Sequence, residues 1–233
     1  MKRIIYLCLS LFIIPVTLLA QPTQDSLNAG VATDTTSLWN ALIKGNISGH
    51  ARYYFMATNN QDTLTDYWAH AAGSKIKYES APFKHFTLGL SFSFAANLGS
   101  SDLSTPDPAT NQLNRYESGL FDVTDLSKES MFRMDELYLT FKTNKGSIKA
   151  GRQIINTPFI NSQDGRMNVT SVEAAWADFK LDEIRLHGGF IHRISPRSTS
   201  GWYAIHESIG LYPVGFNPDG TKSGYINNLS RSG

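Results

Sequence analysis

The stretch that decides the fold is residues 86–98, FTLGLSFSFAANL, in which large apolar side chains alternate with small or polar ones. Successive side chains of a β-strand point to opposite faces, so a period of two predicts a strand with one apolar and one polar face. The apolar face carries Phe86, Leu88, Leu90, Phe92, Phe94, Ala96 and Leu98, and the other face carries Thr87, Gly89, Ser91, Ser93, Ala95 and Asn97.

The same alternation recurs on both sides of this stretch, and it predicts seven strands between Ile47 and Ile194. The first, fourth and seventh strands alternate clearly, whereas the second and sixth are less regular. The residues predicted for the apolar face of these five strands are Ile47, Ala51, Tyr53 and Phe55; Trp68, Ala72, Ile76 and Tyr78; Leu137, Leu139 and Phe141; Ala175, Ala177, Phe179 and Leu181; and Ile184, Leu186, Gly188, Phe190 and Ile194.

The connections between these strands alternate between short and long. The short ones are residues 80–82, 144–146 and 181–183, and the long ones are residues 59–66, 99–132, 156–170 and the stretch that begins at Ser195. Barrels of the bacterial outer membrane have tight turns on the periplasmic side and long loops outside. The sequence therefore predicts an all-β fold: a transmembrane, antiparallel, up-and-down β-barrel with apolar residues toward lipid. Aromatic residues near strand ends, among them Tyr53, Phe55, Tyr67, Tyr78 and Phe83, fit either interfacial girdles or ordinary strand preference.

The first twenty residues read as a secretion signal, with Lys2 and Arg3 before an apolar run and a predicted cleavage after Ala20. Residues 21–44 are expected to form a flexible periplasmic lead, with one helical turn between Ser37 and Lys44. Without the signal the chain has 21 − 2 = 19 basic and 20 acidic residues. This near neutrality argues against nucleic-acid binding, which needs a strongly basic domain.

Catalytic and cofactor motifs are weak in this chain. His206 and Glu207 lack the second histidine of a metalloprotease helix, no glycine-rich phosphate loop is present, and the six histidines show no metal-ligand spacing. A barrel hydrolase could use a Ser/His pair, but nothing singles one out. The sequence therefore predicts a protein that is not an enzyme and needs no cofactor.

The candidate functional residues are basic side chains that the strand alternation places on the lumen side of the barrel. Five of them come from several strands that converge on one lumen, where they would attract anions: Arg52, Lys142, Lys149, Arg185 and Arg193. Alternatively, lumen carboxylates such as Glu136 and Asp178 pair with them, or water solvates them. Arg152 is grouped with this basic ladder, although strict alternation places it on the lipid face.

Three segments resemble the OprD-type outer-membrane porins, which are substrate-preferring channels: residues 49–54, GHARYY; residues 151–153, GRQ; and residues 157–166, TPFINSQDGR. The likeness covers most of Gly45 to Ile194. It implies that the segment after GRQ folds into the lumen and narrows it, so Asn161, Ser162, Asp164 and Arg166 are predicted to form the constriction. The alternative is that Asp164 and Arg166 mainly tie the loop to the wall.

The resemblance implies a monomer of about eighteen strands when full length, passing small solutes such as amino acids, peptides or other carboxylates through the outer membrane. Only seven segments are clear here. Residues 45–233 are therefore expected to be the amino-terminal part of such a barrel, an open half-barrel of seven or eight strands from a truncated chain or a gene fragment. The competing hypothesis is a small, non-conducting barrel that serves as an anchor or adhesin.

Overall fold

The structure, a computed structural model, describes residues 36–157, 160–208, 211 and 220. All of them belong to one compact unit, Thr33–Gly233. The predicted signal and most of the predicted lead lie outside the described residues. The elements are α1 (Leu38–Ile43), β1 (Asn46–Thr58), β2 (Tyr67–Glu79), β3 (Phe86–Ser100), η2 (Ser118–Leu120), β4 (Ser130–Thr143), β5 (Gly146–Gln153), β6 (Ser171–Leu181), β7 (Ile184–Ser195), β8 (Tyr203–Ala204) and α2 (Ile205–Ser208).

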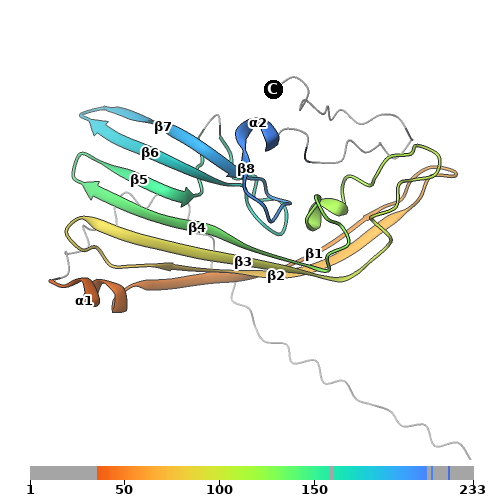
Figure 1. Ribbon diagram of the computed structural model, residues 1–233, viewed down its shortest axis with the longest axis horizontal. Helices are drawn as coiled ribbons and strands as arrows, with labels where there is room; N and C mark the ends of the chain where they lie inside the picture. The colour runs from red at the N-terminus through yellow and green to blue at the C-terminus, as the bar shows by residue number, and fades with distance from the viewer. Residues whose placement is uncertain (1–35, 158–159, 209–210, 212–219, 221–233) are drawn as a thin grey trace, which may run out of the picture. The chain divides into compact units, whose positions relative to one another are not determined.

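Eight strands form one antiparallel sheet in which each strand pairs with its neighbour in sequence, in the order β1 to β8 (Figure 1). Within the described residues β1 and β8 are the two edges, so the sheet does not close on itself. The predicted up-and-down, open sheet of seven or eight strands is confirmed. Among the described residues no helix is both long and apolar enough to span a membrane.

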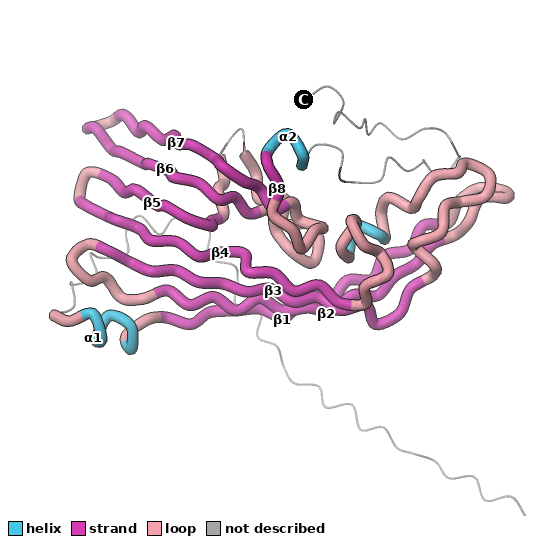
Figure 2. Tube along the Cα trace, viewed as in Figure 1, coloured by secondary structure: helices cyan, strands magenta, loops and turns pink. Residues whose placement is uncertain are grey.

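The connections confirm the predicted alternation. Residues 80–85, 144–145 and 182–183 join strands at one end of the sheet, and residues 59–66, 101–129, 154–170 and 196–202 join them at the other (Figure 2). The sheet therefore has a short-turn end and a long-loop end. The predicted turn before the first strand is also present, because α1 begins after Ser37, whose side chain accepts a hydrogen bond from the Asn40 amide at 3.2 Å.

The two faces of the sheet differ sharply. The face bearing Phe86 and Leu139, here called the outward face, is covered with exposed apolar side chains. These are Ile47, Tyr53, Phe55, Trp68, Ile76, Phe86, Phe94, Leu98, Phe132, Leu137, Leu139, Phe141, Ile148, Phe179, Leu181, Ile184, Leu186 and Phe190. The predicted apolar face is thus found on each strand, with Ile194 of β7 as an exception. Tyr67 is an exception to the girdle prediction, because it is buried on the opposite, inward face.

Three bulges interrupt the register of the described strands, and two of them, in β4 and β7, change the face on which charged residues lie. In β4 the register against β3 shifts beside Asp135, so Asp135 and Glu136 are both buried although they are consecutive. In β7 the shift falls at His192, and it places Arg193 opposite Glu173 while Ile191 and Ile194 pack inward near Val172. The prediction that Arg193 faces inward and Ile194 outward is therefore wrong, since strict alternation does not continue through a bulge.

The long β3–β4 connection folds back onto the inward face. Its residues Leu103, Leu120 and Phe121 form an apolar cluster with strand residues that include Tyr67 and Met131. Burial of Asp107 would raise its pKa, but hydrogen bonds from Thr65 and Thr110 hold that pKa at about 2. The loop is thus packed against the sheet by apolar contacts and charge-assisted hydrogen bonds.

Truncation of this cluster should release the loop. Leu120 is fully buried, so Leu120→Ala should destabilise the loop packing by about 2–5 kcal/mol and speed proteolysis between residues 101 and 129. Leu113→Ala is the control, because Leu113 is half-buried and lies outside the cluster. Equal cleavage rates for the two variants, measured by limited proteolysis and mass spectrometry, would contradict the assignment.

Candidate functional site

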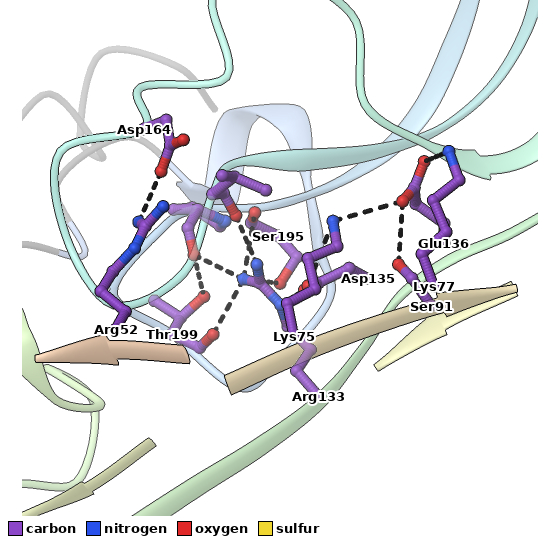
Figure 3. Close-up of polar contacts among 12 residues, drawn as sticks. Arg52, Lys75, Lys77, Ser91, Arg133, Asp135, Glu136, Asp164, Ser195 and Thr199 are labelled. Atoms are coloured by element: carbon purple, nitrogen blue, oxygen red, sulfur yellow. Dashed lines mark hydrogen bonds and ion pairs between the residues drawn. The ribbon is translucent and has the colours of Figure 1, made fainter. Parts of the chain in front are cut away.

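A network of charged side chains occupies the inward face of β2, β3 and β4. The Lys75 ammonium lies 3.2 Å from Glu136 and 3.7 Å from Asp135, and the Lys77 ammonium lies 3.4 Å from Glu136 (Figure 3). The Ser91 hydroxyl donates to Glu136 at 2.9 Å. The β4 bulge is what allows both carboxylates to face the same lysine.

Towards the short-turn end the network continues through a tyrosine. The Tyr138 hydroxyl donates to Glu79 at 2.5 Å, and the Lys149 ammonium lies 4.3 Å from the centre of the Tyr138 ring. Gly89 lies beneath this ring, where an added Cβ would come within 2.1 Å of it. Lys149 is thus held over an aromatic face, where a cation is attracted by the ring quadrupole.

Arg133 on β4 fixes two loops at once. Its side chain is 1% exposed and pairs with Asp135 at 2.6 Å. The same guanidinium donates to the backbone oxygens of Pro196 and Thr199 at 2.9 and 3.0 Å, and to that of Val169 (Figure 3). The buried side chain of Arg133 therefore holds both the end of the β5–β6 loop and the β7–β8 loop against the sheet.

The β5–β6 loop reaches across the inward face to β1. The Arg52 guanidinium donates to the Asp164 carboxylate at 2.6 Å (Figure 3). It also donates to the backbone oxygen of Arg166 at 2.5 Å. Asn161 accepts from the Gln163 amide at 2.6 Å, so it shapes a turn within the loop. Since β5 and β1 lie four strands apart in the sheet order, the loop spans the polar side of the sheet.

The long loops also contact one another. Ser198 donates to the backbone oxygen of Gly119 at 2.6 Å, and the Ser200 hydroxyl donates to Asp122. The backbone oxygen of Ser162 accepts from the Thr170 amide at 2.7 Å, which closes the base of the β5–β6 loop. The β3–β4 and β7–β8 loops, which are far apart in the sequence, thus meet at the long-loop end.

The predicted basic ladder is divided by the structure. Alternation puts Arg52, Lys142, Lys149 and Arg185 on the inward face, and Arg185 forms a paired contact with Asp178 at 2.7 and 3.0 Å. Arg152 lies on the outward face, where it contacts Met134 and lies 3.6 Å from Glu173. The remaining member, Arg193, faces outward as well, because of the β7 bulge.

Sequence reasoning missed the three inward cations that pair with Asp135 and Glu136, which are Lys75, Lys77 and Arg133. Lys75 and Lys77 have the parity of the polar face, so a stricter reading of the second strand would have found them. The role of Arg133 left no sequence signal, because its partners are backbone oxygens about 36 to 66 residues away along the chain.

No family model and no curated protein sequence matches this chain. Solved structures do match it. OccK9 (OpdG) of Pseudomonas aeruginosa superposes with a TM-score of 0.52 at 16% identity, over 70% of this chain and 42% of that one. The chain has the fold of the OprD/Occ porins.

Two further porin structures agree. A BenF-like porin from Pseudomonas fluorescens Pf-5 gives a TM-score of 0.53 at 15% identity, over 69% of this chain and 39% of that one. OccAB1 of Acinetobacter baumannii gives 0.53 at 11% identity, over 74% and 39%. The chain thus spans about two fifths of the length of the porins it resembles.

Removing the buried guanidinium of Arg133 should lower the free energy of unfolding far more than removing the exposed guanidinium of Arg185. Arg133→Gln leaves Asp135 without its close partner and should destabilise the folded protein by about 3–5 kcal/mol. Arg185→Gln removes a cation whose side chain is 51% exposed and should cost at most about 1 kcal/mol. Urea-induced unfolding in vesicles measures both; similar losses would show that Arg133 is not the anchor of the two loops.

Proposed function

We propose that this chain supplies part of the wall of an outer-membrane porin of the OprD/Occ type, through which small solutes diffuse passively. The observation that carries the proposal is the contrast between the two faces of the sheet. An apolar outward face suits contact with lipid, and a charged inward face covered by loops suits a narrowed aqueous path. No step in this function requires a nucleotide, a metal or a catalytic group.

The constriction is proposed to form where the β5–β6 loop meets Arg52. The contacts of Arg52 with Asp164 and with the Arg166 backbone hold the loop over the inward face. Asp164 is 41% exposed even in this pair, so it remains accessible to a passing solute. Asn161 and Ser162 lie on the same loop and add polar groups, whereas their hydrogen bonds within the loop mainly fix its shape.

The solute class proposed is small molecules that carry a carboxylate, including amino acids and peptides. The inward face offers cations from six strands, β1, β2 and β4 to β7, and Lys149 lies over Tyr138 with no carboxylate contact among the described residues. OpdK, a porin of the same fold, was solved with vanillate; it gives a TM-score of 0.51 at 18% identity, over 68% of this chain and 38% of that one. Vanillate is an aromatic carboxylate, which fits a site that combines a cation with an aromatic ring.

Conductance tests the proposal directly. The full-length protein that contains this chain should form ion-conducting channels in planar bilayers, because a barrel lumen is a continuous aqueous path. Folded protein that inserts but never conducts would refute the porin assignment and favour the anchor or adhesin.

Loop deletion tests the constriction. Removing residues 161–166 from the full-length protein should raise single-channel conductance and weaken solute preference, since the segment that Arg52 holds over the path is gone. Arg52→Gln should move conductance in the same direction by a smaller amount. Unchanged conductance in a folded deletion variant would place the loop outside the permeation path.

Charge variants test the selectivity. Lys149→Gln should shift the reversal potential away from anion preference more than Arg185→Gln does, because Asp178 already neutralises Arg185. Reversal potentials in asymmetric salt measure both variants. The inverse order would show that the Arg185 pair, rather than Lys149, sets the potential of the path.

A further inference from the structure

A row of three charged side chains crosses the outward face of β5, β6 and β7. Arg152 is the register partner of Glu173, and Glu173 is the register partner of Arg193. Cross-strand partners share a face, and Glu173 lies between the buried residues Val172 and Ala174, which point inward. The row therefore faces outward along its whole length.

The row of Arg152, Glu173 and Arg193, here called the ionic row, lies on an otherwise apolar surface. Within the described part of β1 to β7, every other outward position is apolar, glycine, serine, threonine or histidine, so the row holds all the outward Asp, Glu, Lys and Arg side chains. The next outward row toward the short turns is Ala150, Ala175 and Phe190. Charge thus begins where the apolar surface of these three strands ends, at the long-loop end.

The position of the row fits a membrane interface. A charged residue on the lipid face is costly at the bilayer centre, and the cost falls toward the interfaces. Aromatic residues take the corresponding place on β1 and β2, where Tyr53, Phe55 and Trp68 surround His70, and the Tyr53 hydroxyl lies 2.5 Å from the His70 ring nitrogen. Both groups mark the long-loop edge of the apolar surface.

The side chains of the row are arranged to take an anion. Arg152 lies 4.6 Å from the Trp202 ring, which holds its guanidinium in one orientation, and its distance to Glu173 is a loose 3.6 Å. Arg193 is exposed, and no partner for its side chain is found among the described residues. Two guanidiniums flank one carboxylate, so the row has a net charge of +1. Guanidinium groups bind phosphate through paired hydrogen bonds.

We propose that this row is a binding site for the phosphate group of a lipid in the outer leaflet. The inference rests on the proposed function, because it requires the apolar outward face to contact a bilayer. Arg152 and Arg193 would each donate to phosphate oxygens, while the acyl chains of the lipid lie along Ala150, Ala175 and Phe190. Glu173 lies between the two arginines, offsets part of their positive charge and so weakens the site for an anion.

Lipid affinity measured on the full-length protein tests the inference. The probe is lipid A with both phosphates, bound to detergent-solubilised protein and compared with dephosphorylated lipid A. The double variant Arg152→Gln/Arg193→Gln should bind the phosphorylated form about tenfold more weakly, and the dephosphorylated form should bind wild type and variant alike. Lys180→Gln is the matched control, because Lys180 is an exposed inward cation on the same β6 strand and should leave lipid affinity unchanged.

A second variant separates a lipid site from a self-contained ion pair. Glu173→Gln removes the central negative charge and should tighten binding of phosphorylated lipid A by about threefold. If the three residues only neutralise one another, this variant leaves the affinity unchanged and the inference fails. Inorganic phosphate is the competing probe: displacement of lipid A at millimolar phosphate would show a general phosphate site and would overturn the assignment to lipid.

Conductance recorded in parallel keeps the two proposals distinct. If the channels conduct normally but the substitutions in the row leave lipid A affinity unchanged, this inference is overturned and the porin function is not. Wild-type protein that inserts without conducting would overturn the porin function instead.

Discussion

A β-strand sends alternate side chains to opposite faces, and this constraint governs the rest of the structure. Backbone hydrogen bonds run only between neighbouring strands, so both faces are free to carry different chemistry. In this sheet one set of positions holds Phe, Leu and Ile, and the other holds Ser, Lys, Asp and Glu. The separation of apolar and charged surface in space is therefore written as a period of two along the chain.

Bulges are the local exceptions to this constraint, and two of the three in the described strands change the position of charged residues. The β4 bulge turns Asp135 and Glu136 to the same side, where both approach Lys75. The β7 bulge moves Arg193 out of the inward set and opposite Glu173. One extra residue in β4 thus assembles an ionic cluster on the inward face, and one extra residue in β7 completes another on the outward face. The placement of charged side chains therefore depends closely on strand register.

The long loops cover the inward face, and buried polar contacts hold them there. All three nitrogens of the Arg133 guanidinium donate to carbonyl, hydroxyl or carboxylate oxygens instead of water. Arg52 makes similar contacts with the β5–β6 loop, where it donates to Asp164 and to the Arg166 backbone oxygen. An unpaired buried charge has a high free-energy cost. Detaching these loops from the sheet would break the contacts of both arginines, so the loops stay in place. The covering of the inward face is therefore a property of the folded loops rather than of the strands.

The sequence by itself determined the strands, their order of short and long connections, and the apolar face, because these depend on local periodicity and turn chemistry. Resemblance in short motifs identified the loop after Gln153, and Arg52 was selected from its parity alone. Only the tertiary structure decided that Arg52 pairs with Asp164, that Arg133 anchors two loops, and that Arg193 faces outward. Contacts between residues far apart in sequence depend on strand register and loop packing, and one bulge reverses a face without leaving a clear mark in the residue pattern.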